Sequence, residues 1–114
     1  MIKLRKNILI AALISSSFTS FIAAAGCTEN GCLSKVDTLY MSGNGNIFIG
    51  TTDDEKLLDC DAVSDVYITL KPTHKNFEPI YSALLATQLA DKEIYLRILN
   101  GSDSCELSYA SLKS

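Results

Sequence analysis

Four cysteines carry the most definite chemistry in this sequence: Cys27, Cys32, Cys60 and Cys105. In an exported chain, an even number of cysteines indicates disulfides, and four cysteines allow three pairings. We favour Cys27–Cys32, which closes a small loop, together with Cys60–Cys105, which ties the segment before one predicted strand to the start of the last. A metal site is the alternative. No two cysteines have the two-residue spacing of zinc ligands, so we expect no metal.

Three acidic residues, Asp59, Asp61 and Asp65, have a spacing that approaches that of a calcium-binding loop. Such a loop needs glycine at its sharp turn and a bidentate glutamate at its end. Ser64 and Leu70 occupy those two positions here. We therefore interpret the segment as a solvated acidic loop.

The sequence contains few residues that could carry out catalysis. The single histidine, His74, stands in a predicted connection just before a helix, and no serine or cysteine nucleophile motif accompanies it. The sequence also contains no pair of carboxylates in a recognisable catalytic motif, and it contains no phosphate-binding loop. We expect a protein that is not an enzyme and that needs no cofactor.

The first 25 residues have the composition of a secretory signal. A basic start precedes an apolar run at residues 8–14, and three alanines at residues 23–25 suit a signal peptidase. The run is shorter than the roughly 20 residues that a membrane-spanning helix needs, so we expect no membrane span. We predict cleavage before Gly26, export to the periplasm or the medium, and one small domain at residues 26–114.

A lipoprotein signal is an alternative interpretation of the same segment. Ala25 and Gly26 match the two positions before the lipid-carrying cysteine of bacterial lipoproteins, which would be Cys27 here. Ala24 departs from the leucine usually found one position earlier. Lipid on Cys27 would leave Cys32 without its expected partner.

The mature chain of 89 residues is acidic. Its 7 Lys and Arg against 13 Asp and Glu give a formal net charge of −6. Such a chain repels phosphate backbones, so we expect no nucleic-acid partner. A chain this short buries only about 60–65% of its unfolded surface and gains from covalent links. On a chain-entropy model, the long loop closed by Cys60–Cys105 would contribute about 4 kcal/mol.

Residues 76–91 have the strongest helical periodicity of the mature chain. Asn76 can accept an amide of the first turn, and Pro79 is tolerated there because those amides have no helical partner. We expect six large apolar side chains to form one stripe that is buried against a sheet. The stripe comprises Phe77, Ile80, Tyr81, Leu84, Leu85 and Leu89.

Five strands are predicted around this helix, after an irregular start. Turn signals at Gly43–Asn46 and at Asn100–Gly101 separate two of the strand pairs. Alternation in the third strand places Val66 and Ile68 on its buried face and Tyr67 on the other. The predicted strands are residues 33–41, 47–49, 63–70, 93–99 and 105–110.

The resulting order, strand, strand, strand, helix, strand, strand, resembles the OB-fold, a five-stranded barrel whose helix plugs one end. At the level of fold it also resembles the B subunits of bacterial AB5 toxins, which are short, secreted, disulfide-linked OB-folds that form pentameric rings and bind host glycans. The resemblance covers residues 33–112, and it depends on element order, size, export and Cys60 and Cys105. Residues 76–86 are similar to a stretch of small exported bacterial proteins. We therefore predict a mainly β fold with one helix (α+β), an OB-like barrel in the order β-β-β-α-β-β.

The resemblance implies where a ligand would bind. OB-folds bind on the face of strands two and three and in the loops that join strands one–two and four–five. Tyr67 would offer a ring for stacking beside those loops. The polar candidates in the two loops are Asn44, Asn46, Asn100, Ser102 and Asp103. The alternative is that these residues are turn formers only.

Two functions stay open at this point. The first is an exported, non-enzymatic binding module, glycan-binding or an assembly subunit of a secreted complex, with a homo-oligomer as one possible form. The second is a periplasmic or envelope interaction protein, such as an inhibitor or immunity factor for another exported protein. The acidic residues 53–61 would then meet a basic partner, with charge giving association rate and specificity.

Overall fold

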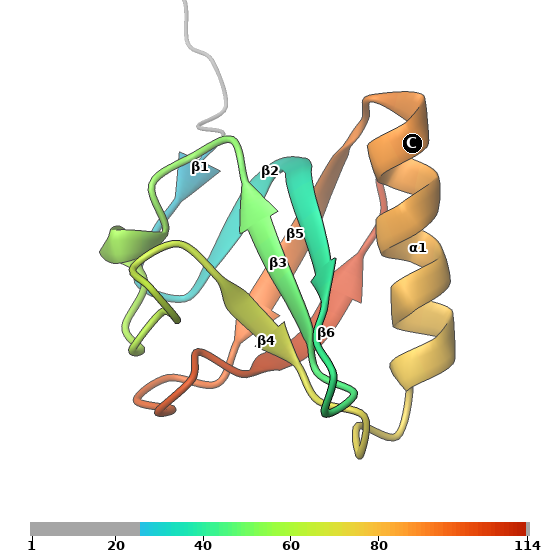
Figure 1. Ribbon diagram of the computed structural model, residues 1–114. Helices are drawn as coiled ribbons and strands as arrows, with labels where there is room; N and C mark the ends of the chain where they lie inside the picture. The colour runs from blue at the N-terminus through green and yellow to red at the C-terminus, as the bar shows by residue number, and fades with distance from the viewer. Residues whose placement is uncertain (1–25, 114) are drawn as a thin grey trace, which may run out of the picture.

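The computed structural model describes residues 26–113 (Figure 1), so the predicted signal at residues 1–25 lies outside the described part of the chain. Within residues 26–113, the fold is mainly antiparallel β with one α-helix, α1 (Phe77–Ala90), and a short 3-10 helix, η1 (Glu55–Leu57). The strands are β1 (Gly26–Cys27), β2 (Gly31–Met41), β3 (Ile47–Thr51), β4 (Ile68–Leu70), β5 (Glu93–Ile98) and β6 (Leu107–Ser111).

Six strands are present where five were predicted, and the extra one is β1. It pairs with β2 at the start of the chain that was expected to be irregular, with Cys27 opposite Cys32. These two residues form a disulfide, which holds the short strand against its neighbour. The second disulfide joins Cys60 and Cys105, so both pairs are those that we favoured. In this structure the Cys27 sulfur is bonded to Cys32, the partner that the lipoprotein alternative would leave unpaired.

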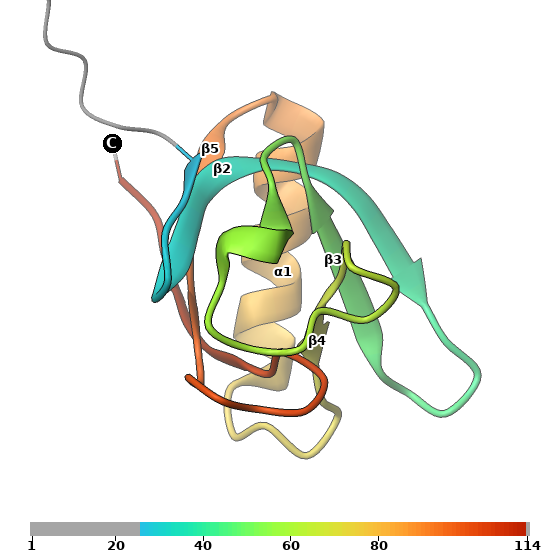
Figure 2. The same cartoon turned by 90° about the vertical axis from the view of Figure 1, so that its left-hand side faces the viewer.

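The strand β2 is the centre of the sheet, whose order is β4-β3-β2-β5-β6. Its first half pairs with β5 and its second half pairs with β3. A bulge between Val36 and Thr38 separates the two halves. A bulge bends a strand and increases its twist, so β2 can serve both halves of a curled sheet. Figure 2 shows the strong curvature of this strand.

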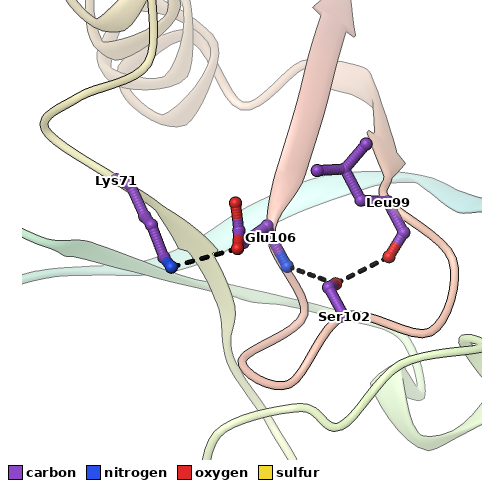
Figure 3. Close-up of polar contacts among 4 residues, drawn as sticks. All are labelled: Lys71, Leu99, Ser102 and Glu106. Atoms are coloured by element: carbon purple, nitrogen blue, oxygen red, sulfur yellow. Dashed lines mark hydrogen bonds and ion pairs between the residues drawn. The ribbon is translucent and has the colours of Figure 1, made fainter.

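The two outer strands, β4 and β6, come together and curl the sheet into a ring (Figure 2). Thr69 and Glu106 form a parallel bridge, and the Thr69 N–H donates to the Cys105 carbonyl at 2.9 Å. The Lys71 ammonium lies 3.0 Å from the Glu106 carboxylate beside the same bridge (Figure 3). We call these contacts the β4–β6 join.

The core fills the inside of the ring and the space under α1. The helix lays Ile80, Leu84 and Thr87 against the sheet, where it contacts β2, β5 and β6. Alternate residues of the strands complete the core, as the period-2 pattern predicts. The largest fully buried apolar side chains are Ile49, Ile68, Leu70, Leu84, Ile94, Leu96 and Ile98. No helix among residues 26–113 is long and apolar enough to cross a membrane.

The predicted apolar stripe of the helix is buried only in part. Leu89 is 79% exposed and Leu85 is 36% exposed, so the prediction that both lie against the sheet was wrong. The helix carries apolar or small residues on nearly all sides, and the 3.6-residue period therefore could not tell which side faces the core.

The start of the helix is also held differently from the prediction. Asn76 is the N-cap residue, but its side chain makes no capping hydrogen bond. Instead its backbone N–H donates to Nδ1 of His74 at 3.0 Å, and Nε2 of His74 lies 2.7 Å from the Ser108 carbonyl of β6. His74 therefore links the β4–α1 connection to β6.

The predicted third strand is shortened to its last three residues. Residues 63–67 form a turn in which the amides of Val66 and Tyr67 donate to the Val63 carbonyl. Ser64 and Asp65 adopt left-handed backbone angles, with φ of 55° and 64°. Val66 is consequently exposed rather than buried.

Candidate functional site

Three aromatic side chains meet on the outer surface of β2, β3 and the start of β4. The ring centroids of Tyr40 and Phe48 are 5.6 Å apart, and Tyr67 lies 6.2 Å from Tyr40 and 6.0 Å from Phe48. We call these three residues the aromatic cluster. Tyr40 is 52% exposed, so the cluster offers ring surface to solvent.

The register of the hairpin explains why these rings meet. Tyr40 on β2 is paired with Phe48 on β3, and Phe48 is paired with Thr69 on β4. Ile47 and Ile49 point into the core, so Phe48 between them must point outward. Cross-strand aromatic pairs of this kind also stabilise a sheet.

A glycine makes room for the third ring. A Cβ placed on Gly50 would lie 3.4 Å from Cε1 of Tyr67 and 3.4 Å from Cβ of Thr38. The Tyr67 ring therefore occupies the surface that a side chain at position 50 would take. Thr69, beside the cluster, is fully buried, and its hydroxyl oxygen has no hydrogen-bond partner.

The predicted ligand residues of the first turn contact each other. Oδ1 of Asn44 accepts from the Ser42 hydroxyl and from the Asn46 N–H, the latter at 3.1 Å. The Asn46 carbonyl accepts from the Ser42 N–H at 2.9 Å. These contacts close the β2–β3 turn and occupy part of the hydrogen-bonding capacity of both asparagines.

The predicted residues of the second turn are likewise bonded within the protein. The Asn100 amide nitrogen lies 3.1 Å from Asn30 Oδ1 and 3.2 Å from Asp59 Oδ2. The Ser102 hydroxyl donates to the Leu99 carbonyl at 2.6 Å and accepts from the Glu106 N–H at 2.9 Å (Figure 3). Asp103 is exposed at the tip.

The two turns lie at different corners of the molecule. The β2–β3 turn and the β5–β6 turn, which contains residues 100–104, are well separated in both Figure 1 and Figure 2. The structure thus brings Tyr67 together with two other rings, and it does not gather the two sets of polar loop residues around that ring.

A second concave surface lies on the outer face of β2, β5 and β6. Two adjoining hollows of about 380 and 330 Å³ share Leu33, Tyr95, Ser111 and Lys113 in their walls. Lys35, at the rim, lies 3.2 Å from the Asp91 carboxylate. This groove offers one tyrosine ring, whereas the aromatic cluster offers three rings in contact.

A smaller cleft of about 240 Å³ holds the only histidine of the chain. Both ring nitrogens of His74 are engaged, one by the Asn76 N–H and one by the Ser108 carbonyl. The neighbouring Lys71 and Glu106 are paired with each other. A base or nucleophile would need a free atom directed at a ligand, and these groups are occupied in structural contacts.

The acidic segment is partly turned inward. Glu55 is buried, and its carboxylate accepts from the Thr51 hydroxyl at 2.8 Å and from the Thr51 N–H. Asp53 accepts from the Ser34 hydroxyl. Asp54 caps η1 by accepting from the Lys56 N–H at 3.1 Å. Within residues 26–113, no group of three or more His, Cys, Asp or Glu side chains has an arrangement suited to a metal ion.

Sequence reasoning named Tyr67 but missed its two partners. The signal that could have found them is the turn at residues 43–46, because a hairpin of that register sets Tyr40 opposite Phe48. We compared the chain with protein-family models, with curated proteins and with solved structures, and none of them matches it.

Proposed function

We propose that this protein is an exported, non-enzymatic OB-fold module that binds carbohydrate on its aromatic cluster. The observation that carries the proposal is the meeting of Tyr40, Phe48 and Tyr67 on an outward sheet face, with Tyr40 half exposed. The three rings pack edge to face or tilted against one another, with interplanar angles of 64°, 69° and 37°, and give an apolar and preorganised surface.

The strand pairing supports the OB-fold assignment. If β1 is set aside, the remaining five strands pair in the order β4-β3-β2-β5-β6, the β4–β6 join closes the ring, and α1 connects β4 to β5 along the chain. In this reading β3 and β4 are strands two and three of the barrel. These are the strands on which OB-folds bind oligosaccharides and oligonucleotides; Phe48 lies on β3, and Tyr67 directly precedes β4.

Charge favours a sugar over a nucleic acid as the ligand. A mature chain with net charge −6 repels phosphates, whereas a neutral sugar meets no such barrier. The C–H face of a pyranose ring can pack on an aromatic ring such as that of Tyr40, which is 52% exposed. Two disulfides in a small domain suit an oxidising compartment outside the cytoplasm.

A glycan array followed by calorimetric titration tests the proposal. We expect Tyr40→Ala to weaken binding of the best glycan about tenfold, which corresponds to about 1.4 kcal/mol. Tyr109→Ala is the matched control, because Tyr109 on β6 is 50% exposed, close to the 52% of Tyr40, and lies outside the cluster. Failure of the wild-type protein to bind any glycan, or an equal loss in both variants, would overturn the proposal.

The exposed acids favour an envelope interaction protein as the second candidate. Asp54, which caps η1, and Asp59, Asp61 and Asp65 between η1 and β4 are all exposed. A basic partner docked there would associate quickly at low salt and more slowly as salt screens the charges. Recovery of one basic protein at stoichiometric yield from envelope extract, lost when Asp59 and Asp61 are changed to Asn, would support this candidate.

A further inference from the structure

The outer face of β2, β5 and β6 carries one row of paired residues. Leu33 on β2 is paired with Tyr95 on β5, and Tyr95 is paired with Ser111 on β6. Gly26 on β1 is paired with Leu33 at the other end of the row. Paired residues of neighbouring strands lie on the same face of a sheet, so the row crosses four strands. The two adjoining hollows of about 380 and 330 Å³ both have Leu33, Tyr95 and Ser111 in their walls, and we call them together the Tyr95 groove.

Gly31 determines where the Tyr95 ring lies. A Cβ placed on Gly31 would be 2.8 Å from the hydroxyl oxygen of Tyr95 and 3.0 Å from its Cζ atom. Gly31 is paired with Arg97, which is two residues beyond Tyr95 on β5. The ring therefore leans along the sheet and occupies the surface that a side chain at position 31 would take. The half-buried side chains of Tyr95 and Leu33 give the groove an apolar floor, with the phenol hydroxyl above Gly31.

The groove is basic, although the molecule is acidic. Three of the 7 basic residues of the mature chain, Lys35, Lys92 and Lys113, line it. Asp91 and Glu93 are the two carboxylates in the same walls, so the groove has a formal charge of +1. The rest of the mature chain keeps 4 basic and 11 acidic residues, which gives a formal charge of −7. An anion therefore meets a favourable charge at the groove and an unfavourable charge over the remaining surface.

The ammonium group of Lys113 is available to a ligand. Lys35 Nζ lies 3.2 Å from the Asp91 carboxylate, so these two charges largely cancel. The only other ion pair among residues 26–113 lies outside the groove walls. Lys113 is exposed and lines both hollows together with Ser111 and Tyr95. A carboxylate bound here can accept hydrogen bonds from one ammonium group and two hydroxyl groups.

We propose that the Tyr95 groove binds a small organic carboxylate. Its apolar body packs on Leu33 and Tyr95, and its carboxylate lies beside Lys113. The single excess positive charge of the groove matches one negative charge, whereas a phosphate monoester or a nucleic acid brings more negative charge into the field of the surrounding −7. The hollows, at about 380 and 330 Å³, lie at the lower end of the range of ligand pockets, which suits a small molecule.

The binding should be weak and sensitive to salt. The groove is open to solvent along its length, and an ion pair with an exposed lysine changes an affinity only about threefold. We therefore expect a dissociation constant of about 1–10 mM, which should rise as salt screens the charges.

Two-dimensional NMR titration with phenylacetate tests the proposal. Phenylacetate supplies one ring and one carboxylate, phenylacetamide supplies the ring without the charge, and acetate supplies the charge without the ring. We expect saturable shifts of the Leu33, Tyr95 and Ser111 amide signals with phenylacetate. Phenylacetamide and acetate should each bind at least about threefold more weakly. Phenyl phosphate, which carries more negative charge, should also bind more weakly than phenylacetate.

A pair of lysine variants tests the position of the carboxylate. Lys113→Gln should weaken phenylacetate binding about threefold. Lys75→Gln is the matched control, because Lys75 is also exposed and lies outside the groove walls, and it should leave the affinity unchanged. Both side chains face solvent, so both variants should keep the dispersed amide spectrum of the folded protein.

Five results would overturn the proposal. They are an absence of saturable shifts up to about 50 mM phenylacetate, shifts confined to the aromatic cluster, equal binding of phenylacetate and phenylacetamide, tighter binding of phenyl phosphate, and equal losses in Lys113→Gln and Lys75→Gln. None of these measurements uses a sugar or changes a residue of the aromatic cluster, so this proposal and the carbohydrate proposal fail separately.

Discussion

The ring of Tyr67 covers Gly50, with its Cε1 atom 3.4 Å from where a side-chain carbon of residue 50 would begin. A glycine inside a strand leaves a gap in the outer face of a sheet, and an aromatic ring from the neighbouring strand can fill it. The same contact fixes the ring that completes the aromatic cluster. Tyr67 therefore contributes both to the stability of the sheet and to the proposed carbohydrate-binding surface.

Two substitutions at Gly50 should separate these roles. Gly50→Ala adds one methyl group at an ordinary contact distance and should raise the free energy of unfolding by up to about 1 kcal/mol, because alanine has less freedom in the unfolded chain. Gly50→Val adds two further carbons where the Tyr67 ring lies, so it should displace the ring and weaken carbohydrate binding. Urea denaturation measures the stability of both variants, and calorimetric titration measures their carbohydrate affinities. Equal carbohydrate affinities in the two variants would contradict the prediction.

Thr69→Val should leave stability unchanged or increase it by up to about 1 kcal/mol. The Thr69 hydroxyl is fully buried without a hydrogen-bond partner, and valine has nearly the same shape. Thr51→Val is the matched control, because the Thr51 hydroxyl is also buried but donates to Glu55 at 2.8 Å. That variant should lose about 1–3 kcal/mol. Chemical denaturation measures both, and a larger loss for Thr69→Val would contradict the structure.

The two disulfides should contribute unequally to stability. Cys60 and Cys105 are 45 residues apart in sequence, whereas Cys27 and Cys32 are 5 apart. On the chain-entropy model, replacing the first pair with serines should cost about 4 kcal/mol and replacing the second about 2 kcal/mol. The urea midpoints of the two double variants test this ranking. A lower midpoint for the variant without Cys27 and Cys32 would refute it.

His74→Ala should loosen the beginning of α1. The substitution removes the acceptor of the Asn76 N–H and the partner of the Ser108 carbonyl. We expect a loss of about 1–2 kcal/mol and faster hydrogen exchange at the Asn76 amide. Lys75→Ala, at the adjacent exposed position, should change neither quantity. Unchanged exchange at Asn76 in His74→Ala would show that the contact is not stabilising.

The strands with regular alternation were predictable, and the segments governed by special backbone angles were not. Residues 93–99 alternate apolar and polar side chains and form β5 at Glu93–Ile98. Residues 63–67 alternate equally well, but Ser64 and Asp65 take left-handed angles and turn the chain. Nothing in their side chains requires that geometry. The turn is closed by backbone hydrogen bonds from Asp65 to Ala62 and from Val66 and Tyr67 to Val63, which the alternation of side chains does not encode.

The sequence indicated one individual residue of the site, but it did not indicate which side chains come together there. Tyr67 was predicted as an outward ring on the strand at residues 63–70, but the contact between Tyr40 and Phe48 depends on register, which is set by how the β2–β3 turn closes. The side chains of Asn100 and Ser102 could equally well bind a ligand or stabilise a turn. The structure commits both to bonds inside the protein, with Asp59 and Leu99 among the partners. Composition cannot tell these two uses apart.

The β4–β6 join makes closure of the curled sheet dependent on the redox state of its surroundings. One parallel bridge and one ion pair hold the strands there, and the Cys60–Cys105 bond ties the chain just before β4 to the chain just before β6. Each strand pair in the order β4-β3-β2-β5-β6 is held by at least three paired residues, whereas the β4–β6 join has one bridge. We therefore expect reduction of the Cys60–Cys105 bond to open the join before the rest of the sheet, and oxidation to close it again.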